Sequence, residues 1–123
     1  MYVFNNNFGN ISYYNDKLDI NINKKYCNDD IHQFINELEV IYLKINEKFN
    51  FICNFSDMEF INIPISFNKQ LITFFTRNYK ISENYLNQIV IITSSNFLKK
   101  LLNTIFLLYS MPHPVSIIKK KSN

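Results

Sequence analysis

The sequence predicts an α/β fold: a mixed, largely parallel sheet that begins with an antiparallel hairpin and packs against three helices. Segments with the apolar pattern of strands come first, and then alternate with segments of helical periodicity. The resulting order, β-β-β-α-β-α-β-α-β, is typical of a sheet with parallel crossovers. At 123 residues, 47% of them hydrophobic and 16% aromatic, the chain fits one domain with one core.

The first strands are predicted on either side of the chain's single glycine. Residues 2–8 and 11–14 are rich in β-forming side chains, and the Asn-rich stretch around Gly9 is typical of a hairpin turn. Apolar and polar residues then alternate over 18–23. This period of two predicts a half-buried third strand.

Apolar residues recur at helical spacing from Ile31 to Ile45, which predicts the first helix. The preceding residues, 28–30, are Asn, Asp and Asp, which suit the start of a helix. Residues 49–55 predict a fourth strand, and residues 56–59 the loop that leaves it.

A short segment, Phe60 to Pro64, leads into a second predicted helix from about Ser66 to Tyr79, since proline suits a helix start. Residues 88–93 form a continuous run rich in β-branched side chains. Such a run is typical of a parallel strand that is buried on both faces.

A third helix is predicted over 97–109 and a last strand over 115–118. We therefore expect a single domain over residues 1–118, followed by a basic tail at 119–123. The many Asn, Ile and Lys residues indicate an A/T-rich coding sequence, so the net charge of +3 carries little functional meaning.

The stretch from Asn54 to Pro64 reads N-F-S-D-M-E-F-I-N-I-P. At Phe55-Ser56 and Phe60-Ile61 it resembles, in kind and spacing, the D-L-S-G-V-x-F-I-D-S-S-G loop of STAS domains, the fold of bacterial anti-sigma-factor antagonists. The segment 82–86 similarly resembles the P-E-R-L helix end of the related, lipid-binding CRAL-TRIO domains. The resemblance implies a STAS-like fold and a binding function rather than catalysis.

The chain departs from the STAS pattern at the regulatory serine. Ile63 or Pro64 stands where the family has the serine that is phosphorylated, and Asn62 replaces the neighbouring aspartate. The family's phosphorylation switch is therefore not expected in its usual form. Ser66 lies slightly further on and is interpreted either as a helix-cap hydroxyl or as a regulated residue.

Residues for cofactor or metal chemistry are missing from the sequence pattern, so no cofactor is expected. A phosphate-binding loop needs glycines between a strand and a helix, and Gly9 does not stand at such a position. His32 and His113 have no neighbouring ligand at metal-site spacing. Asp57 and Glu59 form a carboxylate pair in a loop, where a solvated role is favoured over acid–base catalysis.

Cys27 and Cys53 are interpreted as structural thiols in a reducing compartment, with one disulfide as the alternative. The sequence shows no secretory segment and no run of 18 apolar residues that could span a bilayer. A cytoplasmic protein is therefore expected.

Nucleic-acid binding is not favoured by the distribution of aromatic and basic residues. The best local cluster has Tyr13, Tyr14 and Tyr26 near Lys24 and Lys25. Single-strand binders need exposed aromatics beside a basic groove, whereas most aromatic residues here follow the periodicity of a core.

We therefore expect a non-catalytic, regulatory binding module that acts through protein–protein interaction or self-association. Its partner-binding surface is predicted at the start of the second helix, where apolar side chains are expected to be exposed: Asn62, Ile63, Ile65, Ser66 and Phe67. The alternative is a carrier of a lipid or small apolar ligand of the CRAL-TRIO kind. Its pocket would lie between the second and third helices and the sheet.

Overall fold

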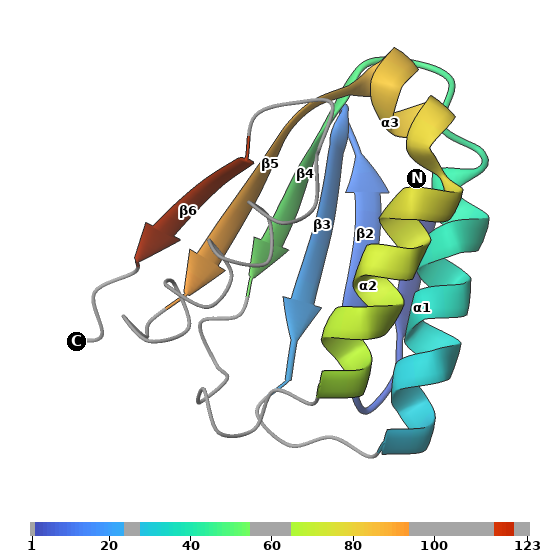
Figure 1. Cartoon of the computed structure of the whole chain (residues 1–123), viewed down its shortest axis with the longest axis vertical. Helices are drawn as coiled ribbons and strands as arrows, with labels where there is room; N and C mark the ends of the chain where they lie inside the picture. The colour runs from blue at the N-terminus through green and yellow to red at the C-terminus, as the bar shows by residue number, and fades with distance from the viewer. Residues whose placement is uncertain (1, 24–27, 55–64, 94–114, 120–123) are drawn as a thin grey trace.

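The computed structural model describes residues 2–23, 28–54, 65–93 and 115–119 (Figure 1). The elements follow the order β1-β2-β3-α1-β4-α2-α3-β5-β6, and the strands form one sheet in the sequential order β1-β2-β3-β4-β5-β6. The predicted α/β class and mixed sheet are confirmed. The helix predicted over 97–109 and the segment 60–64 lie outside the described residues.

The first three strands form an antiparallel meander of β1 (Tyr2–Asn5), β2 (Gly9–Tyr14) and β3 (Lys17–Ile22). The turn between β2 and β3 consists of Asn15 and Asp16, with φ angles of 50° and 60°. Asn and Asp tolerate this left-handed conformation better than other non-glycine residues, and two such residues in a row suit the twist of a tight hairpin.

Gly9 begins β2 and is required for a reason other than turn geometry. Its φ is not positive, but a Cβ atom at this position would overlap the backbone carbonyl of Asn21 in β3. The preceding turn is held by Asn6, whose Oδ1 accepts the N–H groups of Phe8 at 2.9 Å and Gly9 at 3.2 Å. The Asn6 Nδ2 donates to the carbonyl of Asp30 at 2.9 Å and so ties the hairpin to the first helix.

The second half of the sheet is parallel. The strands β4 (Phe49–Asn54), β5 (Leu86–Thr93) and β6 (Val115–Lys119) confirm the predicted strands and are added one after another beside β3. When each new parallel strand is added on the same side of the previous one through a right-handed connection, all the connecting helices lie on one face of the sheet. Accordingly, α1 (Asn28–Tyr42) and α2 (Ile65–Arg77) lie side by side over the same face (Figure 1).

The second helical region differs from the single helix that was predicted to end near Tyr79. The helix α2 ends at Arg77, and a separate short helix, α3 (Tyr79–Tyr85), follows it. Asn78 separates them with non-helical backbone angles, φ −106° and ψ 28°. Its side-chain Nδ2 donates to the carbonyl of Phe74 at 3.0 Å and to Oε2 of Glu39 at 2.7 Å, so the break is fixed by side-chain hydrogen bonds.

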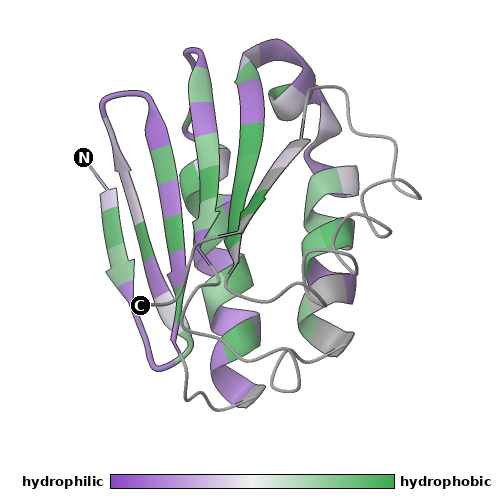
Figure 2. Cartoon of the chain, turned by 90° about the vertical axis from the view of Figure 1, so that its left-hand side faces the viewer, coloured by the Kyte–Doolittle hydropathy of each residue, from purple (hydrophilic) through white to green (hydrophobic). Residues whose placement is uncertain are grey.

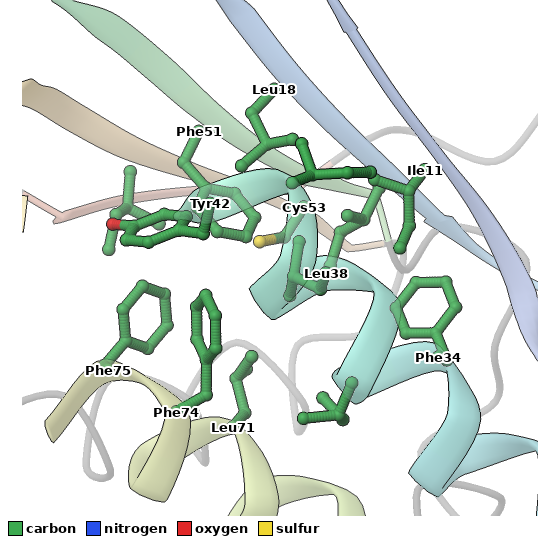
Figure 3. Packing of buried hydrophobic residues seen from close by; sticks show 14 of the residues in the cluster. Ile11, Leu18, Phe34, Leu38, Tyr42, Phe51, Cys53, Leu71, Phe74 and Phe75 are labelled. Carbon is green, nitrogen blue, oxygen red and sulfur yellow. The ribbon is translucent and has the colours of Figure 1, made fainter. Parts of the chain in front are cut away.

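The core lies between the helices and one face of the sheet and is rich in aromatic rings (Figure 3). The Tyr42 ring of α1 lies at its centre, in edge-to-face contact with Phe49 of β4 at 5.4 Å and with Phe74 of α2 at 4.8 Å. The buried Tyr42 hydroxyl is also 2.6 Å from Oγ of Ser82, which joins α1 to α3.

Candidate functional site

The predicted partner-binding segment is only partly described by the structure. Asn62 and Ile63 lie outside the described residues, and so do the side chains of Ile65 and Ser66, which begin α2. The Phe67 side chain is described and is 0% exposed, with its ring 5.0 Å from that of Phe8. The prediction of an exposed Phe67 is therefore wrong.

Phe67 is buried because it belongs to the apolar face of α2. Phe67, Leu71 and Phe74 follow the spacing i, i+4, i+7, so all three side chains turn toward the sheet. A surface built on this helix start cannot include the Phe67 ring unless the helix moves.

Cys53 is a free thiol that is buried in β4 on the helix-covered face. Burial raises the pKa of Cys53 well above its ordinary value, and the negative charge of Asp19 raises it further. A protonated, inaccessible thiol is a poor nucleophile, so Cys53 has the structural role that was predicted. Cys27 lies outside the described residues.

Other residues considered for chemistry are dispersed or not described. His32 is exposed on α1, whereas Asp57, Glu59, His113 and the cluster at 24–26 lie outside the described residues. Within the described ranges, no group of three or more His, Cys, Asp or Glu side chains could hold a metal ion. In the same ranges, no helix is both long and apolar enough to cross a membrane.

The sheet face that points away from α1 and α2 is the most distinctive surface of the described chain. We call it the open face, because none of its described residues is buried. Its members come from alternate positions of all six strands, as the registers show: Val3, Asn5, Asn10, Ser12, Tyr14, Lys17, Asp19, Asn21, Asn50, Ile52, Asn54, Gln88, Val90, Ile92, Ser116 and Ile118.

The alternation within β4 illustrates the difference between the two faces. Phe49, Phe51 and Cys53 are buried, whereas the residues between them, Asn50 to Asn54, are half-buried. The banding of apolar and polar residues along the strands is visible in Figure 2. No described helix or strand packs on the open face, so the sheet is covered on one side within the described residues.

A contiguous apolar patch occupies the parallel half of the open face. It consists of Ile52, Val90, Ile92 and Ile118: Ile52 is paired with Val90, and Ile92 with Ile118. The Ile118 side chain is 51% exposed. We call these four residues the open-face patch.

The open-face patch corrects the prediction for the strand at 88–93. That run was predicted to be buried on both faces, but only Ile89 and Ile91 are buried, and Val90 and Ile92 are half-buried. Sequence alone does not distinguish a covered apolar face from an uncovered one, because both give a continuous β-branched run.

The antiparallel half of the open face is mostly polar with few charges, although the side chains of Val3 and Tyr14 are exposed there. Asn5, Asn10, Asn21 and Asn54 form a row across four neighbouring strands, and Asn21 Nδ2 donates to Asn10 Oδ1 at 3.1 Å. Asp19 stands in the adjacent row, where partial burial raises the pKa of its carboxyl although the charge of Lys17 lowers it.

Lys17 and Asp19 are the charged residues among those described on the open face, and they lie two positions apart on β3. The other described side chains of this face are mostly amides and aliphatic groups, together with the hydroxyls of Ser12, Tyr14 and Ser116. The arrangement is suited to binding another surface.

No family model, curated protein or solved structure was found to match the chain. Its function is therefore inferred from the geometry of its own residues.

Proposed function

We propose that this protein is a non-catalytic binding module that docks another protein through the open face of its sheet. The main support is the open-face patch, which is apolar and contiguous and is only partly buried: Ile118 is exposed, and Ile52, Val90 and Ile92 are half-buried. Exposed apolar patches with a polar surround are typical of protein interaction sites.

The low charge of the open face supports a protein partner. Centres of protein interfaces are depleted in charged residues and have a polar rim. The open-face patch contains no charge, and the neighbouring Asn residues can exchange hydrogen bonds with a partner at little desolvation cost compared with ions. Among the described residues of this face, Lys17 is the one lysine and stands near Asp19 on β3, which argues against a phosphate backbone as ligand.

The proposal moves the expected surface away from Phe67 but leaves the neighbouring segment as a further prediction. Asn62, Ile63, Ile65 and Ser66 can still contribute to binding, and the STAS-like and regulatory assignments also remain proposals. The lipid-carrier alternative also stays a prediction, because its pocket was expected beside the helix predicted over 97–109, which lies outside the described residues.

A charge placed in the open-face patch tests the proposal. Ile118→Glu introduces a carboxylate at an edge-strand position that is 51% exposed, so the fold is expected to tolerate it. Leu43→Glu is the matched control, because Leu43 is 61% exposed beyond the end of α1 and lies away from the open face.

Proteins that co-purify with the tagged wild-type chain from its source cells should be lost with Ile118→Glu and retained with Leu43→Glu. Light scattering after size-exclusion chromatography gives the mass of the wild type and of both variants. A mass above that of one chain that is lost with Ile118→Glu and kept with Leu43→Glu identifies self-association through the open face. If both variants keep the same partners and the same mass as the wild type, the open face is not the docking surface. Circular dichroism of both variants verifies that each is folded.

A further inference from the structure

A groove between α1 and α2 lies on the outer side of the helix layer, away from the open face. It has a volume of about 230 Å³. Its wall on α1 comes from His32, Ile35 and Asn36, and its wall on α2 from the following side chains: Lys69, Gln70, Thr73 and Arg77. Ile35 is only 4% exposed and therefore forms part of an apolar floor beneath polar side chains.

The polar groups of this groove include two cations, Lys69 and Arg77, and the donor amides of Asn36 and Gln70. None of the described residues that line it is acidic. The Lys69 ammonium has no hydrogen-bond or ion-pair partner among the described residues, and neither do the side-chain amides of Asn36 and Gln70. An uncovered set of donors of this kind is suited to an anion.

Arg77 is held at one end of the groove by Glu39. Its Nε donates to Glu39 Oε2 at 2.7 Å, and Asn78 Nδ2 donates to the same oxygen at 2.7 Å. Burial by itself raises the pKa of Glu39, but the two hydrogen bonds and the charge of Arg77 outweigh it and lower the pKa. The bond to Glu39 uses Nε, so the two terminal amino groups of the guanidinium remain available to a ligand. Because Glu39 holds the guanidinium in place, these two groups are already oriented for binding.

We propose that this groove binds the phosphate monoester group of a small soluble molecule. A tetrahedral phosphate offers three terminal oxygens to the Arg77 fork, the Lys69 ammonium and the amides of Asn36 and Gln70. Lys69 and Arg77 stand eight residues apart on α2, about 12 Å along the helix, so both cations reach one phosphate only with their side chains extended toward each other. At roughly 30 Å³ for each water-sized group, the volume holds about seven or eight such groups, enough for a phosphate and a short organic remainder over Ile35. This inference is independent of the open face.

Phenyl phosphate is the probe, added to the ¹⁵N-labelled full chain at constant ionic strength and followed by NMR. Amide shifts are expected at the groove residues Asn36, Lys69 and Thr73. The expected dissociation constant is on the order of 1 mM, which lies within the bound that ligand efficiency sets for a molecule of this size.

Lys69→Gln should weaken binding about tenfold, because it removes one charge-assisted contact without breaking any described bond. Lys80→Gln is the matched control, since Lys80 is exposed on α3 outside the groove and its replacement removes the same charge. The control should bind phenyl phosphate within a factor of two of the wild type.

Four results would overturn the proposal. Shifts that do not fall on the groove, or equal affinities of Lys69→Gln and Lys80→Gln, would reject the site. Benzoate that binds as tightly as phenyl phosphate would reject the assignment to phosphate. Co-sedimentation with phosphatidate vesicles that is lost in Lys69→Gln would assign the groove to a lipid headgroup instead of a soluble molecule.

Discussion

The two faces of the sheet are built from the same strands but from different side chains. On β3 and β4, the helix-covered face carries Leu18, Ile20, Phe51 and Cys53, which are all buried. Residues that alternate with them on the open face are largely Asn, with Asp19 and Ile52, and these are half-buried, whereas Lys17 at the start of β3 is exposed. The comparison teaches that the chain concentrates its core on one side, and that the apolar residues on the other side need a different explanation.

Aromatic contacts add to the asymmetry. A tilted pair links β4 to α2, with the ring centroids of Phe51 and Phe75 5.6 Å apart. An edge-to-face pair links the first hairpin to α1, with the ring centroids of Phe8 and Phe34 5.1 Å apart. Such pairs add roughly 0.5–1.5 kcal/mol beyond the burial of their area. The stability of the described fold therefore depends on the helix-covered face.

The largest expected difference in stability between the two faces comes from substitutions of two neighbouring residues on β4. Phe51→Ala is expected to lower the free energy of unfolding by about 3–5 kcal/mol, because it leaves a cavity among packed rings. Ile52→Ala, one residue further along and half-buried on the open face, should cost about 1 kcal/mol. Urea denaturation measures both, and equal losses would mean that the open face is covered as firmly as the other.

Removal of one tyrosine hydroxyl on each side of the sheet should give a smaller difference in stability. Tyr42→Phe removes a hydroxyl that is 2.6 Å from Ser82 in the buried core, and should cost about 1–2 kcal/mol. Tyr14→Phe on the open face removes an exposed hydroxyl and should change stability by less than about 0.5 kcal/mol. A Tyr42→Phe variant as stable as the wild type would show that the hydroxyl pair contributes nothing.

The two carboxylates Glu39 and Asp19 should give the smallest effects, with opposite dependence on pH. The lowered pKa of Glu39 means that its ionised form stabilises the fold above the unfolded value, about 4.3, and that this contribution is lost as the pH falls through the folded value. The raised pKa of Asp19 means the reverse: protonation near and above its unfolded value, about 3.9, relieves an unfavourable charge on the open face.

Glu39→Gln should therefore lower stability at pH 7 by about 0.2–1 kcal/mol and reduce the loss of stability between pH 7 and pH 3.5. Asp19→Asn should leave stability at pH 7 equal or higher and increase that loss. Urea midpoints at the two pH values, compared with the wild type, measure both effects. The same sign of change for both variants would contradict the assigned environments.

Much of the fold could be predicted from sequence periodicity, since the six strands and α1 follow their apolar patterns closely. The short helix α3 could not, because its seven residues give only one apolar pair at helical spacing, Ile81 and Tyr85, and its buried polar residue Ser82 contacts Tyr42 of a distant element. The break before it depends on Asn78, whose hydrogen bond to Glu39 joins residues 39 positions apart.

The candidate site was harder to predict because it depends on strand register. Ile52, Val90 and Ile118 are distant in sequence and form one patch only after β4, β5 and β6 are paired. For Phe67 the signal was present, since its spacing to Leu71 and Phe74 matches the buried side of a helix. The interpretation of the helix start as an exposed surface gave that spacing too little weight.

Each strand of the sheet has beside it the strand that was synthesised just before it. A chain emerging from a ribosome can therefore pair β1 with β2, and then add β3, β4 and β5 in turn, without waiting for a later segment. The first two pairings need only short turns, so they close early, whereas the parallel strands need longer connections and join later. The growing edge is the newest strand, so each new edge stays open only until the next strand of the same chain is added.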